Sequence, residues 1–291
     1  MPNLRAPTSK EIVLDPVRAN HGVEVWYRRQ LEFLVGQMNR SVLHWLPAAW
    51  KKAPPRVIAK DNALRVFTVS GDVDLEALQL AMDAPSSVVL LQRAMARMSR
   101  YWQKRFNDAS RELSEKFADK AQEHTDLSMM AVLKKAGFTV RFVNTPLRAQ
   151  VFDAVVAENV GLIKSIPAQY FRDVEQAVWA SVSQGRDLQQ LTDTIMEKYG
   201  IASRRAQFIA RDQNNKAKAH MEAARRAKLG IKEANWMHSH GGRKPRPEHV
   251  AFDGKRYTIA KGAYLENKWV WPGTEPNCRC TDRGIIPGFD D

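Results

Sequence analysis

Cysteine is scarce in this chain, which has two cysteines among 291 residues. So few cysteines argue against the disulfide framework that stabilises small secreted domains. The first residues, MPNLRAPTSKEIVLDP, lack a basic start followed by an apolar core, so we expect no signal peptide. No apolar run is long enough to cross a bilayer. We therefore expect a protein that folds in a reducing cytoplasm and has no membrane partner.

Acidic residues are also in deficit, with 32 Asp and Glu against 45 Lys and Arg and a formal net charge of +13. This balance favours a polyanionic partner such as nucleic acid, although it carries no information about the fold. The hydrophobic fraction of 44% is ordinary for a globular protein. The length is enough to bury a substantial core in one large domain or two.

Apolar residues recur at helical spacing through most of the first 230 residues. The pattern predicts helices over 22–46, 85–124, 146–163, 168–184, 187–199 and 203–229. Pro47, Pro54 and Pro55 are expected to end the first helix, and Gly185, Gly200 and Gly230 to end later ones. Between the helices we expect a hairpin around Asp61-Asn62 and a strand at 137–143.

After Gly230 the character of the chain changes to short strand-like pieces between Gly and Pro turns. These pieces are EANWMH at 233–238, KRYTI at 255–259 and KWVW at 268–271. The fold class expected is α+β, with long helices in the N-terminal and middle regions and a small C-terminal α+β domain. The parts are an N-terminal arm with an amphipathic helix at 1–55, a mainly helical domain at 56–202, and the C-terminal unit at 203–291.

Most of the excess positive charge falls between residues 203 and 246. Four of these cations recur every seven residues: Arg204, Arg211, Lys218 and Arg225. On a helix they would form one slowly drifting basic stripe, which could follow the phosphates of double-stranded DNA without reading sequence. The alternative is a helix face whose cations are solvated or paired with acids, and both interpretations stay open. No aromatic ladder accompanies the stripe, so base stacking is not indicated.

Both cysteines lie in EPNCRC, at residues 275–280. A disulfide between Cys278 and Cys280 would close a very small ring with poor geometry. On a strand, residues two apart point to the same face, so both sulfurs could face one point. With His249 and His238 they would make a tetrahedral zinc site, for which two thiolates and two imidazoles suffice. The alternative is that the cysteines are small buried hydrophobes and the histidines bond to the backbone.

Taken in order, the motifs of the second half resemble the Mu F-like minor head protein family of tailed phages. The family pattern is an Ala-Arg-rich helix, a Trp, Arg-Pro-x-His, a Gly, then Pro-Gly and Asn-Cys-Arg-Cys. Here these residues are Ala210, Arg211, Trp236, Arg246, Pro247, His249, Gly254, Pro272, Gly273, Asn277, Cys278, Arg279 and Cys280. The resemblance covers roughly residues 145–285. Many members have an acid between the Trp and the Arg-Pro, where this chain has HSHGG at 238–242, so no role of that acid transfers here.

The resemblance implies a minor component of the phage head that acts at or near the portal vertex during assembly and is linked to DNA packaging or ejection. The partners implied are the portal protein, the major capsid or scaffold protein, and double-stranded DNA. The locations implied are the host cytoplasm during assembly and then the virion. The resemblance implies neither an enzyme nor a cofactor. The cysteine and histidine residues themselves leave structural zinc as the cofactor hypothesis. The other interpretation is an RNase-like enzyme or toxin module using His249 and nearby Arg and His as general acids and bases. No paired carboxylates or phosphate-binding Gly loop accompany that cluster.

Overall fold

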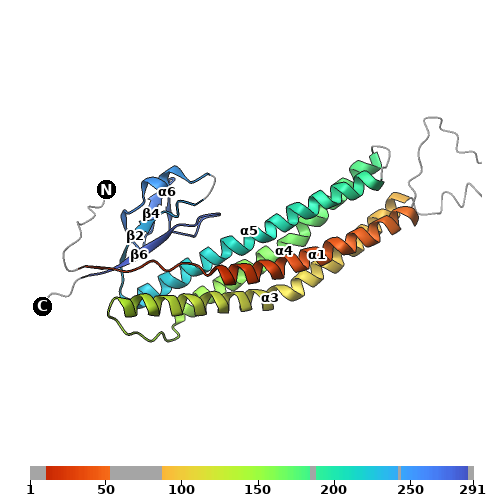
Figure 1. Ribbon diagram of the computed structural model, residues 1–291. Coiled ribbons are helices and arrows are strands. Elements are labelled where there is room, and N and C mark those ends of the chain that lie inside the picture. Colours follow the sequence, from red (N-terminus) through yellow and green to blue (C-terminus); the bar gives the residue numbers. More distant parts are fainter. Residues whose placement is uncertain (1–10, 53–86, 184–187, 242–243, 288–291) are drawn as a thin grey trace, which may run out of the picture. The chain divides into compact units, whose positions relative to one another are not determined.

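The computed structural model describes residues 11–52, 87–183, 188–241 and 244–287. Its four long helices are α1 (His21–Lys52), α3 (Ser87–Lys135), α4 (Pro146–Ser183) and α5 (Leu188–Leu229) (Figure 1). The shorter elements are β1 (Ile12–Val13), β2 (Glu233–Met237), α6 (Pro247–Ala251), β3 (Arg256–Thr258), β4 (Ala263–Leu265), β5 (Lys268–Val270) and β6 (Thr281–Ile286). Long helices together with a small C-terminal sheet confirm the predicted α+β class. Among the described helices, none is long and apolar enough to span a membrane.

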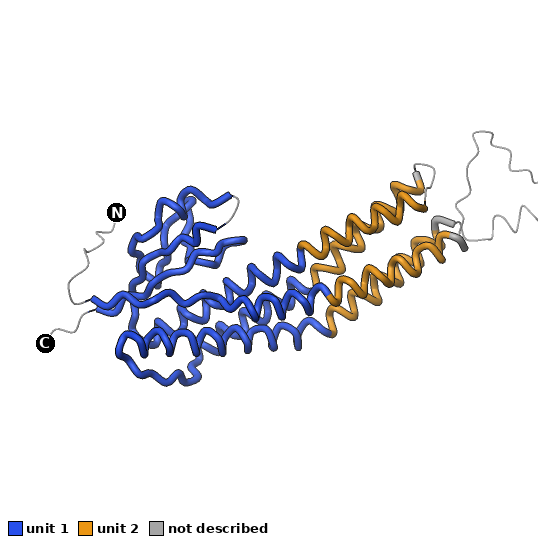
Figure 2. Tube along the Cα trace, viewed as in Figure 1, with its two compact units in different colours: residues 1–32, 109–163, 205–291 blue, residues 33–108, 164–204 orange. Residues whose placement is uncertain are grey.

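The chain divides into two compact units, and each of the four long helices contributes residues to both (Figure 2). Unit 1 comprises Met1–Glu32, Ala109–Ile163 and Arg205–Asp291, and unit 2 comprises Phe33–Asp108 and Lys164–Arg204. This division cuts across the three parts expected from the sequence. Helix α1 contributes to both cores, since Tyr27 and Leu31 are buried in unit 1 and Val35 is buried in unit 2.

The helices are longer than predicted because tertiary burial overrides local helix breakers. Helix α1 continues past Pro47 to Lys52, and Leu46 and Trp50 on either side of the proline are buried. Helix α4 likewise continues through Pro167, and α5 continues through Gly200. The helix ends predicted at Pro47 and Gly200 are therefore wrong.

Other predicted breaks have different outcomes. Gly230 does end α5, with the positive φ of 71° that glycine adopts without steric cost. The hairpin around Asp61-Asn62, Pro54, Pro55 and Gly185 lie outside the described residues.

The strand predicted at residues 137–143 is wrong as well. The backbone there pairs with no strand among the described residues, and Phe138 N–H instead bonds the carbonyl of Leu133 at 2.8 Å, closing the end of α3. The alternating residues Phe138, Val140 and Phe142 are half-buried against the core of unit 1. The alternation therefore reflects one-sided burial of an extended segment.

Unit 1 contains an antiparallel sheet in the order β1-β6-β2-β3, and β4 and β5 form a separate hairpin. Strand β6 lies between β1, where Ile12 faces Ile286, and β2, where Trp236 faces Asp282. The sheet therefore joins segments from opposite ends of the described chain. Strands β2, β3 and β5 fall within predicted pieces, whereas β1, β4, β6 and helix α6 were not predicted.

Candidate metal centre

The two cysteines and His249 are brought together by a short helix and a turn in unit 1. Helix α6 begins at Pro247, a residue suited to the first helical position because its missing N–H would be unpaired there. The helix turns His249 inward, where the side chain is buried. Cys278 and Cys280 come from the turn before β6, and both are buried and free of disulfide bonds.

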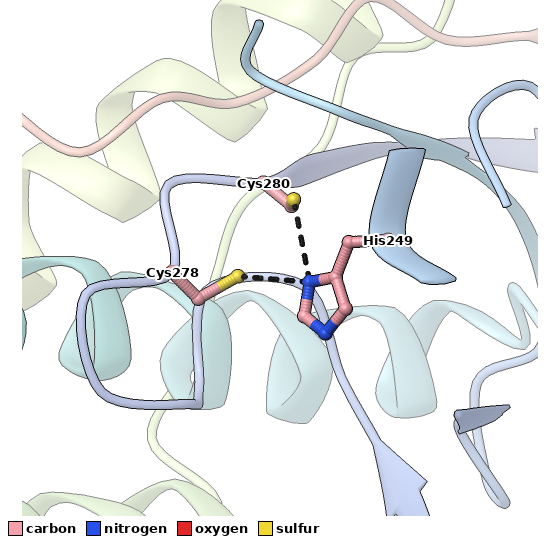
Figure 3. Close-up of side chains that lie close together, drawn as sticks. All are labelled: His249, Cys278 and Cys280. Carbon is pink, nitrogen blue, oxygen red and sulfur yellow. Dashed lines mark hydrogen bonds between the residues drawn. The ribbon is translucent and has the colours of Figure 1, made fainter. Parts of the chain in front are cut away.

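The donor atoms of these three side chains converge on one point (Figure 3). Cys278 Sγ lies 3.7 Å from Nδ1 of His249, and Cys280 Sγ lies 3.8 Å from the same nitrogen. The three ligand atoms all lie within 4.8 Å of one another. Two sulfurs and one imidazole nitrogen at this separation can bind a soft or borderline metal ion.

Helix α5 holds the turn that carries the cysteines. Asp212 accepts the backbone N–H of Asn277 at 2.7 Å, and Arg211 donates to the side-chain oxygen of Asn277 at 3.0 Å. Asn277 has a φ of 60°, a left-handed conformation that asparagine tolerates better than most residues. The Ala-Arg helix and the Asn-Cys-Arg-Cys motif therefore form one structural assembly.

Gly273 approaches the same turn from the other side. Its N–H donates to Cys278 Sγ at 3.4 Å, and its φ is 85°. A Cβ at this position would lie 3.3 Å from the carbonyl oxygen of Cys280. Glycine at this point of the Pro-Gly motif allows the backbone to come close to the sulfur.

The far side of the imidazole is held by a carboxylate. Nε2 of His249 lies 3.0 Å from Oε2 of Glu275, and Glu275 also contacts Lys268 and, at 3.8 Å, Arg246. Burial alone would raise the pKa of Glu275, but Lys268 and Arg246 lower it overall, so the group is a carboxylate. In the neutral imidazole, a carboxylate at Nε2 favours the tautomer with the proton on that nitrogen, which frees the lone pair of Nδ1 for a metal ion.

The two thiols differ in their electrostatics. A hydrogen bond from Cys280 lowers the pKa of Cys278 to about 4, against the effect of burial, and His249 and Gly273 N–H add to the decrease. The same interaction raises the pKa of Cys280, and burial acts in the same direction. Burial opposes the charged form of His249, but Cys278 beside it raises the pKa of the imidazole overall. The site favours one thiolate even without a bound cation.

His238 does not lie within this cluster of three, although the sequence suggested it as a fourth ligand. Its Nδ1 accepts the backbone N–H of His240 at 3.1 Å. The backbone N–H of His238 bonds Asp253, which also lies 2.9 Å from His240 Nε2. His238 and His240, which are two residues apart in the sequence, therefore contact each other and Asp253.

The remaining motif residues surround the cluster. Trp236 is fully buried and meets His249 edge to face, with 5.1 Å between ring centroids. Gly254 has a φ of 74° and donates its N–H to the carbonyl of Trp236 at 2.9 Å. Arg246 donates to the carbonyl of Pro276 at 3.0 Å, whereas Arg279 is exposed.

The four cations expected to form a basic stripe do not share one exposed face. Lys218 and Arg225 are buried and paired, Lys218 with Glu222 at 3.2 Å and Arg225 with Asp126 at 2.5 Å. Arg204 is exposed, and Arg211 is half-buried against the turn. Because the sheet and the end of α3 cover this part of α5, the heptad spacing marks an interior charged face there. The Lys218–Glu222 spacing of four residues was a sequence signal for such pairing.

Comparisons with known proteins agree with the family resemblance that the sequence motifs indicated. The family described as Phage Mu protein F like protein matches residues 172–283. A curated protein of Haemophilus influenzae, described as an uncharacterized protein, is 27% identical over 276 residues, which is 95% of this chain and 55% of that protein. The chain thus spans about half the length of this relative. No solved structure matches. The resemblance to Mu F-like proteins is confirmed for residues 172–283, which contain the three converging side chains.

Proposed function

We propose that this protein is a phage head morphogenesis protein that enters the head as a minor component, at or near the portal vertex, and contacts DNA without sequence specificity. The observation that carries the proposal is the family match over residues 172–283. The proposed locations are the host cytoplasm during assembly and the virion afterwards. The portal protein is the main partner, and the major capsid or scaffold protein is a further one.

The way the motif residues are used supports an assembly role over the RNase-like alternative. A general acid or base must reach the proton that it transfers. His249 is buried, its Nε2 is held by Glu275, and its Nδ1 faces two sulfurs. Asn277 and Arg246 support the turn that carries the cysteines. These residues therefore serve the fold of unit 1, which supports a structural role in a larger particle.

The assembly role is tested by incorporation into particles. The protein is produced together with portal, scaffold and major capsid proteins from the same genome, and particles are purified by sedimentation. We expect the protein in particles that contain the portal and not in particles assembled without it. Its absence from portal-containing particles would contradict the proposal. RNA cleavage that His249→Ala abolishes would support the enzyme instead.

The DNA contact is expected to come from exposed cations, because two members of the predicted stripe are buried. Lys228, Lys232 and Lys261 are exposed in unit 1. Binding to duplex DNA should weaken steeply with salt. Replacing these three lysines by glutamine should reduce the slope of log K against log salt by about 0.9 for each phosphate that the variant no longer neutralises. The measurement is fluorescence anisotropy across a salt series.

A triple variant of α3 with the same change in charge, Lys104→Gln, Arg111→Gln and Lys116→Gln, is the control, since these side chains are 76%, 81% and 60% exposed. We expect the control to retain the wild-type slope. Equal slopes for the two triple variants would contradict a contact at Lys228, Lys232 and Lys261.

A further inference from the structure

We propose that His249, Cys278 and Cys280 bind one zinc ion, which fastens the cysteine turn to helix α6 and stabilises the C-terminal part of unit 1. This inference does not depend on the proposed function. It rests on three converging donor atoms and on the groups that hold them in place. Two thiolates and an imidazole form a donor set that zinc prefers, whereas calcium and magnesium prefer oxygen ligands.

The spacing of the donors is close to that of a tetrahedral zinc site. Bonds of about 2.3 Å to sulfur and about 2.0–2.1 Å to nitrogen place a sulfur and a nitrogen roughly 3.5 Å apart in a tetrahedron. The sulfurs of Cys278 and Cys280 lie 3.7 and 3.8 Å from Nδ1 of His249. Cys278 and Cys280 follow His249 by 29 and 31 residues in the sequence. Movements of a few tenths of an ångström would bring both sulfur–nitrogen distances to the tetrahedral value.

The surroundings supply the second layer of contacts that metal ligands need. Ligating histidines almost always donate their other ring N–H to a carboxylate, a carbonyl or water, and Glu275 occupies that position here. Gly273 N–H donates to the sulfur of Cys278. The buried indole N–H of Trp236 has no hydrogen-bond partner among the described residues. His249 and Cys278 therefore each have a polar group directed at them.

The alternative interpretation, that these are small buried hydrophobes, accounts for less of this arrangement. A thiol that only fills space does not require a buried carboxylate, held by Lys268 and Arg246, behind the neighbouring imidazole. Arg246 lies near Glu275 and also bonds the turn, so the Arg-Pro-x-His motif supplies one ligand and supports another segment. With His238 engaged by His240, a water molecule is expected to complete the tetrahedron.

The test is metal analysis of the full chain purified with reductant. After reconstitution with zinc and removal of excess ion, wild-type protein should hold one zinc per chain by mass spectrometry of the metal. Magnesium and calcium at the same concentration should not be retained. Cobalt(II) should give the sulfur-to-metal absorption and the strong visible bands of a tetrahedral site. Folded, reduced wild-type protein without zinc or the cobalt spectrum would overturn the proposal.

Variants assign the ligands. Cys278→Ser, Cys280→Ser and His249→Gln should lose stoichiometric zinc, and Glu275→Gln, which keeps all three ligands, should weaken zinc binding about 10- to 100-fold in competition with a chromophoric chelator. His238→Gln is the matched control and should retain full zinc. Loss of zinc in His238→Gln equal to that in His249→Gln would overturn the three-ligand assignment. Wild-type metal content decides the proposal even where a ligand variant fails to fold.

Discussion

Arg226→Met is expected to lower the free energy of unfolding of unit 1 by about 3–5 kcal/mol, because it leaves buried charges without their partner. The guanidinium group of Arg226 is buried and lies 2.7 Å from Asp282 of β6 and 2.5 Å from Glu222 of α5. Tyr257 of β3 also bonds Asp282. Arg226 therefore links helix α5 to two strands of the sheet, and methionine would fill much of its volume without neutralising either carboxylate.

The effect should depend on pH in a direction that the network determines. Burial raises the pKa of Asp282, but Arg226 outweighs it, so the pKa is lowered overall. The stability from this pair is therefore present above the ordinary aspartate pKa and is lost as pH falls through the folded-state value. Burial raises the pKa of the neighbouring Glu222 overall, even with Arg226 beside it. Protonating both acids removes the uncompensated charge, so the deficit of Arg226→Met should shrink as the solution becomes more acidic.

Urea denaturation followed by circular dichroism measures this change, with hydrogen exchange of β2 and β6 assigning it to unit 1. The control is Arg111→Met, which breaks an exposed ion pair with Glu115 at 2.8 Å and should cost no more than about 0.5 kcal/mol. A cost for Arg226→Met as small as that of the control would contradict the network. Adding Asp282→Asn should recover part of the stability, because the carboxylate that has lost Arg226 is then neutral, whereas Glu222 keeps its pair with Lys218.

Trp236→Ala is expected to cost about 3–5 kcal/mol, the range for deleting a large aromatic side chain from a core. The side chain has 0% exposure. Its ring meets those of His249, Phe252 and Tyr257 edge to face, at centroid distances of 5.1, 5.8 and 6.1 Å. The cavity would open directly beside the cysteine cluster, so we also expect weaker zinc binding in this variant.

Trp269→Ala provides the comparison, since this tryptophan is 52% exposed and packs mainly on Tyr264 of the same hairpin. We expect a cost below about 1 kcal/mol and unchanged zinc content. Thermal and urea unfolding of the two variants measure the difference. Similar costs at both positions would show that Trp236 is not central to the packing of unit 1.

Features that depend on neighbours along the chain could be predicted from the sequence. The apolar periodicity located the segments that form the four long helices, although it divided α4 and α5 into two helices each. Gly230 marked the end of α5, because a glycine cap is a local feature. The short pieces containing β2, β3 and β5 were also identified. The spacing of Cys278 and Cys280 indicated that both sulfurs face one point, and the order of the motifs along the chain indicated the family.

Features that depend on contacts between distant segments were decided by the tertiary structure. Strand β1 exists because Ile12 and Val13 find Ile286 and Ile285, a pairing that no local pattern encodes. Strand β6 has an irregular sequence, TDRGII, and its buried Asp282 is stabilised by Arg226 of α5 and Tyr257 of β3.

The same reason applies to charge and to helix breakers. A basic stripe on α5 looks exposed in the sequence, but Asp126 of α3 draws Arg225 into the interior. Pro47 does not end α1, because the burial of Leu46 and Trp50 on either side of it stabilises the helix beyond the proline. Sequence alone determined the helical periodicity and the motif that carries the cysteines. Burial, which depends on what packs across the chain, decided which charges lie inside, which breakers act, and which three side chains meet.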